Sequence, residues 1–185
     1  MHDGSSTTSS PLRFRLATAG DAAVLHELVN VAYRGVAGVP GWTHEAGLVA
    51  GPRTNQAELE ALLIREDTLF IAAIDGVRLV ACIRLERDGT DVHLGMFAVQ
   101  PDLQGRGIGK RLLAEVERYA WQVMHARRIV MTVISQRSEL MAFYERRGYR
   151  RLGDVSDYPV HWDVGTPKRA GLTIESLAKW PVAAE

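Results

Sequence analysis

A glycine-rich segment at residues 104–109, Gln-Gly-Arg-Gly-Ile-Gly, constrains this 185-residue chain more than any other feature. The apolar run His93–Val99 precedes it and stops just before Pro101, as a buried strand would. After it, apolar residues recur at helical spacing between Ile108 and Val123. Glycines at such a strand-to-helix turn allow close backbone approach and leave the first helical N–H groups unpaired. Together with the positive end of the helix dipole, these donors predict a site for a phosphorylated ligand.

Two familiar phosphate loops are excluded by spacing. A P-loop needs G-x-x-x-x-G-K-[ST], but Gln104 stands at its first position and Arg111 at its last. A dinucleotide fingerprint needs G-x-G-x-x-G, and Lys110 occupies its final position. The pattern that remains over residues 104–109 is Q-x-x-G-x-G.

This pattern resembles the Q/R-x-x-G-x-G/A signature by which the GNAT superfamily of N-acetyltransferases holds the pyrophosphate of acetyl-coenzyme A. Three further stretches carry the resemblance. Residues Gly95–Pro101 look like the family's fourth strand, Met131–Ile134 like its fifth, and Phe143–Tyr149 like the end of its last helix. The resemblance extends over about residues 12–155 and identifies the chain as a member of this superfamily.

The resemblance implies an α/β (α+β) fold. Its central sheet is mixed, mostly antiparallel and of about seven strands, with four helices and with strands four and five splayed apart. Hydrophobic periodicity leads independently to the same alternation. It predicts strands at 13–16, 69–74, 79–85, 91–99, 128–134, 149–155 and 172–176, and helices after Asp21 and over 55–66, 108–125 and 139–147.

The remaining segments predict loops and one domain. Residues 35–52 and 157–169 are rich in glycine or proline and predict loops, the first with a short helical turn near 44–49. Residues 1–11 are Ser/Thr-rich and predict a flexible tail before a single domain over 12–185.

Composition excludes several classes of function. The formal net charge is zero and the basic residues are dispersed, so no nucleic-acid partner is expected. No apolar run approaches the ~20 residues of a membrane span, and the N-terminus lacks a signal core, so a cytoplasmic protein is expected. The six histidines form no cluster, so no metal is expected. Cys82 lies in an apolar stretch, where a buried thiol is expected rather than a reactive one.

The resemblance assigns the donor site. In the family, the pantetheine arm lies between the splayed strands, and a backbone N–H near Phe97 would stabilise the oxyanion. Arg137 stands where many members have asparagine, and two roles are open for it: contact with a coenzyme A phosphate, or capping of the helix. The residues assigned to acetyl-CoA are Phe97, Ala98, Val99, Gln104, Gly105, Arg106, Gly107, Ile108, Gly109, Lys110 and Arg137.

Two residues are candidates for catalysis. Tyr144 matches the family tyrosine that protonates the departing thiolate, although a buried tyrosine of the last helix could equally be structural. His93 stands where some members carry a glutamate that acts as base. Imidazole, with an ordinary pKa near ~6.5, suits that task, and a structural strand histidine is the alternative.

The acceptor amine is expected to meet the first helix, the loop after it and the loop before the last strand. Candidate residues there are Tyr33, Trp42, Glu45 and Tyr158. Aromatic rings and a carboxylate suit a cationic amine, whereas Trp42 could also simply anchor its loop.

The leading hypothesis is acetyl transfer from acetyl-CoA to a primary amine of a small molecule or peptide, by direct attack in a ternary complex. The alternative is a non-catalytic acyl-CoA-binding module, which would not need Tyr144. O-acetylation, a longer acyl donor, and a monomer or a homodimer all stay open.

Overall fold

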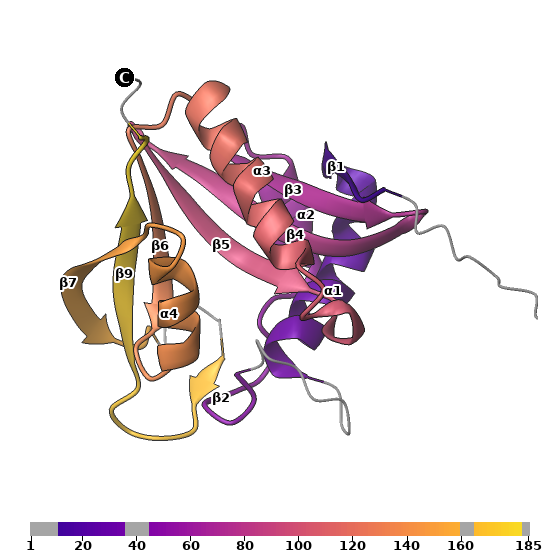
Figure 1. Ribbon diagram of the computed structural model, residues 1–185. Helices are drawn as coiled ribbons and strands as arrows, with labels where there is room; N and C mark the ends of the chain where they lie inside the picture. The colour runs from indigo at the N-terminus through magenta and orange to yellow at the C-terminus, as the bar shows by residue number, and fades with distance from the viewer. Residues whose placement is uncertain (1–10, 36–44, 160–164, 183–185) are drawn as a thin grey trace, which may run out of the picture.

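One sheet of seven strands organises the protein (Figure 1). The computed structural model describes residues 11–35, 45–159 and 165–182. Within these, the strand order is β1-β3-β4-β5-β6-β9-β7, and β5 and β6 form the one parallel pair. The mixed, mostly antiparallel sheet expected from the sequence is confirmed. Its strands are β1 (Arg13–Leu16), β3 (Thr68–Asp75), β4 (Arg78–Asp88), β5 (Asp91–Val99), β6 (Arg128–Ile134), β7 (Arg150–Asp157) and β9 (Thr173–Lys179).

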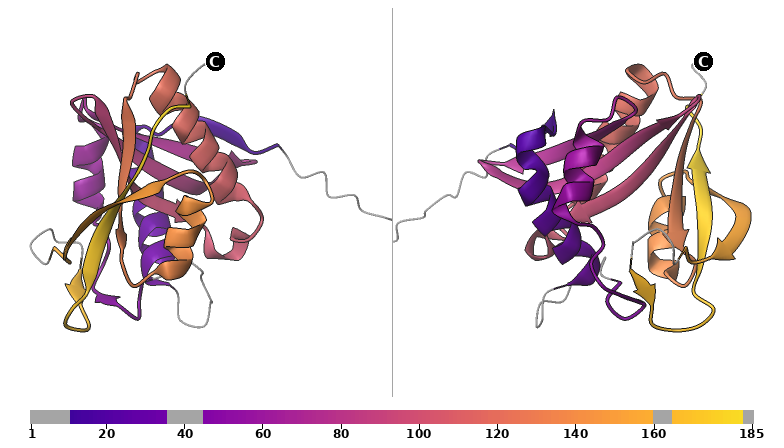
Figure 2. Two further views of the ribbon diagram at one scale, coloured as in Figure 1. Left: turned by 60° about the vertical axis from the view of Figure 1, so that its left-hand side comes forward. Right: turned by 180° about the vertical axis from the view of Figure 1, so that it is seen from behind.

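Four helices cover the two faces of the sheet. The first two, α1 (Ala22–Arg34) and α2 (Gln56–Leu63), lie on one face, as the view from behind shows (Figure 2). The other two, α3 (Ile108–Gln122) and α4 (Ser138–Glu145), share a hydrophobic core with the opposite face. Two short 3₁₀ helices, Ala19–Asp21 and Pro101–Leu103, complete the helical elements among the described residues.

Local sequence explains where the helices lie and why two ends differ from prediction. The apolar face predicted for α1 is entirely buried. Asp21 does not cap that helix, because its carboxylate turns back to the Thr18 backbone N–H and the Arg15 guanidinium. The Asn55 side chain does cap α2, accepting from the Glu58 N–H at 2.8 Å. That helix ends at Leu63 rather than near 66, since Ile64 and the residues after it have no core to face.

Other helix and strand boundaries also differ from those predicted. The last helix, α4, ends at Glu145 with Arg146 as its C-cap, two residues before the glycine predicted for that position. A short ribbon of β2 (Val49–Ala50) and β8 (Thr166–Pro167) lies in segments predicted as loops. Two residues per strand are too few to show a periodic pattern, so this ribbon is recognised only from its pairing in the structure. Most of the expected N-terminal tail at residues 1–11 lies outside the described residues.

The parting of β5 and β6 is the feature that positions the site. Their pairing runs only from Asp91–Arg128 to Leu94–Met131, although both strands continue beyond it. On the other side of β5, the register with β4 slips, and Met96 adopts a left-handed φ of 47°. This bulge bends β5 away from β6, so the two strands diverge visibly (Figure 1). They are the strands that the resemblance counts as fourth and fifth, and their predicted splay is confirmed.

Within the described ranges, no helix has both the length and the apolar character needed to cross a bilayer.

We expect Leu112→Ala to lower the free energy of unfolding by about 2–5 kcal/mol, because Leu112 of α3 is fully buried against the sheet. Val123 at the end of the same helix is 51% exposed, so Val123→Ala should change it by less than about 0.5 kcal/mol. Urea unfolding followed by circular dichroism measures both. Equal losses in the two variants would contradict the assignment of this helix face to the core.

Candidate active site

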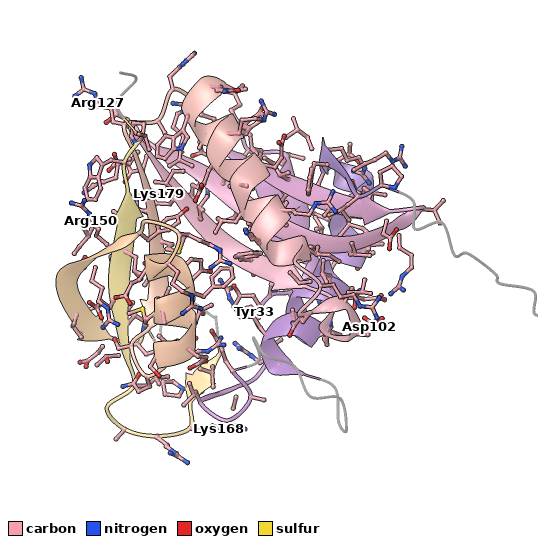
Figure 3. The ribbon with its side chains drawn as sticks, in the orientation of Figure 1. Tyr33, Asp102, Arg127, Arg150, Lys168 and Lys179 are labelled. Carbon is pink, nitrogen blue, oxygen red and sulfur yellow. The ribbon has the colours of Figure 1, made fainter. Side chains whose placement is uncertain are left out.

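A cleft of about 910 Å³ opens where β5 and β6 part. Its walls come from both diverging strands, the glycine segment, α4, and the C-terminal end of α1. In Figure 3, Tyr33 of α1 lies between that helix and α4. The cleft brings together residues predicted from distant parts of the sequence: Tyr33, Glu45, Phe97, Val99, Gln104, Gly105, Gly107, Ile108, Gly109, Lys110, Arg137, Tyr144 and Tyr158.

Three predicted site residues are placed differently, and a fourth is not described. The side chain of Ala98 is buried in the core on the α1 and α2 face. Arg106 is exposed and does not line the cleft. His93 lines a neighbouring hollow instead. Trp42 lies outside the described residues.

The glycine segment needs its glycines for backbone conformation and for close packing. Gly105 and Gly107 both have φ of 79°, and a Cβ at either would meet no atom within 4 Å among the described residues. At Gly109 a Cβ would lie 3.3 Å from Phe97 Cζ, so this glycine lets α3 approach β5. Gln104 Nε2 donates to the Val99 carbonyl at 3.0 Å and fixes the segment to the strand end. The N-terminus of α3 therefore faces the cleft with no side chain capping it among the described residues.

Arg147 is a cleft residue that the sequence reasoning missed. Its guanidinium carbon lies 3.5 Å from the centre of the Phe143 ring, and its Nη1 donates to the Phe143 carbonyl. Its Nε is buried and has no hydrogen-bond partner among the described residues. Such a donor fits an anionic ligand, as does Lys110 beside the glycine segment. In the sequence, the two adjacent arginines of the Glu-Arg-Arg-Gly stretch could have indicated this anion-binding residue.

Tyr144 of α4 faces the cleft and is only 5% exposed. Its ring makes edge contacts with Phe143 and Tyr149, at centroid distances of 5.2 and 5.7 Å. Burial raises the pKa of its phenol far above the ordinary range. The hydroxyl is therefore protonated at neutral pH.

The other end of the cleft holds a buried ion-pair network. Glu45 lies 3.1 Å from Arg34 and 3.8 Å from Arg137, and Arg137 also pairs with Glu139 at 3.2 Å. Arg137 is the N-cap residue of α4, but its side chain makes no capping hydrogen bond. Of the two roles left open for Arg137, the structure thus gives no support to capping.

Two further tyrosines surround this network. Burial raises the pKa of Tyr33 to about 12, and it also raises that of Tyr158. The Tyr33 carbonyl accepts from the Glu45 N–H at 2.6 Å, which ties the start of the following segment to α1. Both phenols are therefore neutral hydrogen-bonding groups at the wall of the cleft.

His93 lies on β5 with its side chain 40% exposed, and its Nε2 is 3.6 Å from Asp88 Oδ2. It lines a second hollow, of about 640 Å³, whose walls are rich in charged side chains. Five residues line both this hollow and the cleft: Arg53, Leu94, Gly95, Met96 and Thr132. His93 thus adjoins the cleft across a shared wall rather than lying inside it.

Cys82 does not reach the cleft. It is fully buried, and burial raises the pKa of its thiol to about 12. This thiol is therefore inert as a nucleophile. Among the described residues, no three His, Cys, Asp or Glu side chains lie close enough together to hold a metal ion.

Comparison with known proteins places these features in a family. Residues 45–157 match the acetyltransferase (GNAT) domain family. An uncharacterised N-acetyltransferase of Methanocaldococcus jannaschii is 35% identical over 113 residues, which span 61% of this chain and 70% of that protein. The S-(2-succino)cysteine N-acetyltransferase of Bacillus subtilis is 28% identical over 150 residues, which span 77% and 86% of the two chains.

A solved structure shares the fold at low identity. The spermidine/spermine N-acetyltransferase of Vibrio cholerae superposes with a TM-score of 0.66 at 17% identity, covering 92% of this chain and 93% of that one. A splayed sheet with a glycine segment at the N-terminus of a helix defines a class of acyl-coenzyme A-dependent transferases. The chain belongs to the GNAT family and is an acetyl-CoA-dependent N-acetyltransferase.

We expect Gly107→Ala to weaken acetyl-CoA binding about tenfold, because a left-handed alanine costs roughly 1–2 kcal/mol and the loop would shift to relieve it. Gly89→Ala is the matched control, since Gly89 has φ of 59° in equally open space but lies in the turn between β4 and β5. Isothermal titration measures the affinities. If Gly89→Ala weakens binding as much, the glycine segment has no special role in holding the coenzyme.

Proposed function

We propose that this enzyme transfers the acetyl group directly from acetyl-CoA to a primary amine of a small molecule or peptide, within a ternary complex formed by one domain over residues 12–185. One observation carries the proposal: the parting of β5 and β6 leaves a single cleft running from the glycine segment to the buried hydroxyl of Tyr144. Both substrates can therefore meet without a covalent enzyme intermediate, and the inert thiol of Cys82 offers no nucleophile for one.

The donor is held by backbone and cationic groups in this proposal. Amide N–H groups at the start of α3 bind the pyrophosphate, aided by Lys110. The unpaired edge of β5 at Phe97 and Val99 binds the pantetheine arm. Arg147 offers a further anion-binding donor, because its buried Nε has no other partner among the described residues. Arg106 is exposed, so in this proposal it contributes at most to the field outside the cleft.

The chemical step follows from the bulge and from Tyr144. The amine nitrogen attacks the thioester carbonyl carbon, and the carbonyl oxygen becomes an oxyanion. A bulge sets two residues opposite one and leaves an N–H unpaired, so an N–H near Phe97 is the proposed oxyanion donor. When the C–S bond breaks, the thiolate takes the proton of the Tyr144 hydroxyl. The nitrogen loses a proton as the amide forms, and the tyrosine regains its own from solvent.

His93 is the proposed base that removes a proton from the incoming amine, acting through water because it lies in the hollow next to the cleft. Its neighbour Asp88 would stabilise the imidazolium that forms. Glu45 is already shared between Arg34 and Arg137 and is less free to accept a proton. Tyr33, Tyr158 and Trp42 are proposed to contact the acceptor.

A non-catalytic acyl-CoA-binding module is the weaker candidate. Such a module would need the glycine segment but neither a neutral buried phenol nor an open acceptor end. Two of the similar proteins are named for their acceptors, S-(2-succino)cysteine in one case and spermidine or spermine in the other, and all of these are amines. That range supports an amine acceptor for this chain without choosing among acceptors.

We expect Tyr144→Phe to lower kcat about 10²-fold, at the low end for a positioned acid, because a thiolate is already a good leaving group. Affinity for acetyl-CoA should stay unchanged. Tyr119→Phe is the control, since Tyr119 of α3 is also partly buried against the core but does not line the cleft. Thiol release measured with a chromogenic reagent gives the rates, and a normal kcat for Tyr144→Phe would remove this tyrosine from the mechanism.

We expect His93→Gln to lower kcat/KM about 10²-fold near neutral pH. If His93 accepts the proton of the amine, the pH–rate profile of the variant should differ from that of the unaltered enzyme. The control is His26→Gln on α1, which faces neither the cleft nor the hollow. A pH–rate profile identical to that of the unaltered enzyme would exclude His93 as base.

A further inference from the structure

Arg53 occupies the wall shared by the cleft and the charged hollow. It is therefore close to the place where, under the proposed function, the acceptor amine meets the thioester. Its guanidinium carbon lies 5.4 Å from the centre of the Tyr33 ring. The sequence alone assigned no role to this arginine.

The backbone of Arg53 is held by Asn30 of α1. The Asn30 Oδ1 accepts from the N–H groups of Arg53 and Thr54, at 2.7 and 3.3 Å. The Asn30 Nδ2 donates in return to the Thr54 carbonyl at 2.9 Å. These hydrogen bonds fix the segment against the helix. These hydrogen bonds involve the backbone of Arg53 and not its guanidinium group.

The guanidinium group itself has no counter-ion among the described residues. Its Nη1 is shielded from solvent and makes no hydrogen bond to any described residue, and no described carboxylate lies within 4 Å of it. A charged group buried without a partner is costly, so an anion that binds here relieves that cost.

The nearby carboxylates are engaged with other groups. Glu45 pairs with Arg34 and Arg137. Glu86 pairs with Arg65 and Arg84, at 3.1 Å in each case. Glu58 accepts from the Thr54 hydroxyl at 2.6 Å.

A second guanidinium faces the same hollow. Arg84 of β4 keeps one ion pair, with Glu86, but its Nε is buried and has no hydrogen-bond partner among the described residues. Its Nη2 would lie 3.2 Å from a Cβ at position 95, so Gly95 makes room for it against β5. Burial and the neighbouring charge of Arg53 both lower the pKa of Arg84. Two under-neutralised cations therefore adjoin the reaction site.

The side chains that line the cleft also carry an excess of positive charge. Among the described residues that line it, Glu45 is the single carboxylate, against four cationic side chains: Arg53, Lys110, Arg137 and Arg147. Lys110 and Arg147 lie toward the donor, which leaves the acceptor end cationic overall. A polyamine would add positive charge there, and a peptide N-terminus would bring a neutral amide beside its amine.

From the unpaired Arg53 guanidinium at the wall between cleft and hollow, we infer that the acceptor is an amine that also carries a carboxylate, and that Arg53 binds this carboxylate. The acceptor is then a free amino acid or a related amino-carboxylate. This inference rests on the proposed acetyl transfer and names the substrate class for the same site. Arg84 supports the position of the negative charge from the far side of the hollow.

The test is a comparison of amino acids with their own amides. Alanine, β-alanine and γ-aminobutyrate are each paired with the matching amide, and S-(2-succino)cysteine and spermidine are added as acceptors. The amine of an α-amino acid amide is less basic than that of the acid, so more of it is neutral and able to react. The amide should therefore react faster than the acid unless the enzyme binds the carboxylate. We expect at least one acid to exceed its amide, and spermidine, by about tenfold or more in kcat/KM.

Variants assign the effect to Arg53. Arg53→Gln should lower kcat/KM for the preferred acid about 10- to 100-fold and leave that for its amide unchanged. Arg53→Lys should retain part of the preference, because it keeps the charge but not the planar fork. Arg78→Gln is the control, an exposed arginine of β4 outside both hollows. Thermal melting checks that each variant folds.

The outcomes separate the inference from the function on which it rests. Turnover of spermidine or of the amides as fast as the acids overturns the inference and leaves acetyl transfer intact. Equal slowing of acid and amide by Arg53→Gln in a folded variant also overturns it. If acetyl-CoA binds but no acceptor in the panel releases thiol, the proposed function fails, and the inference fails with it.

Discussion

The parting of β5 and β6 is the constraint on which the rest of the structure depends. Four residues of parallel pairing hold the strands together at one end, and the bulge at Met96 bends β5 away at the other. A left-handed φ at a methionine is unfavourable, and it persists because the side chain is buried in the core beneath α1 and α2. Packing on one face of the sheet thus keeps the cleft open.

Charge is distributed around this opening in a way that separates its two ends. At one end, the N-terminus of α3 presents backbone N–H groups beside Lys110. At the other end, guanidinium groups lie with Glu45, the single carboxylate among the described residues that line the cleft. Between them lies Tyr144, whose phenol is kept neutral by burial. Under the proposed function, proton donation and recognition of the acceptor's carboxylate come from different elements, α4 on one side and the segment before α2 on the other.

Much of the fold could be predicted because its signals are local. The helical repeat of α3 and the apolar run of β6 are long enough for periodicity to decide them, and the bounds of β6 agree with prediction. The β2–β8 ribbon could not be predicted, since two residues carry no period and the partners are more than a hundred positions apart. Within the site, Gln104 to Lys110 are adjacent in sequence and form a motif. Arg53 and Arg147 become cleft residues only through folding.

The sequence by itself determined the family and the order of helices and strands, because both depend on glycine positions and on hydrophobic spacing along the chain. Tertiary structure decided the environment of each charged group. His93 adjoins the cleft rather than lining it, because strand register sets the face on which it lies. Arg137 joins Glu45 across ninety-two positions of sequence. Burial and ion pairing depend on three-dimensional neighbours, so no linear pattern could reveal that Nη1 of Arg53 is buried without a hydrogen-bond partner among the described residues.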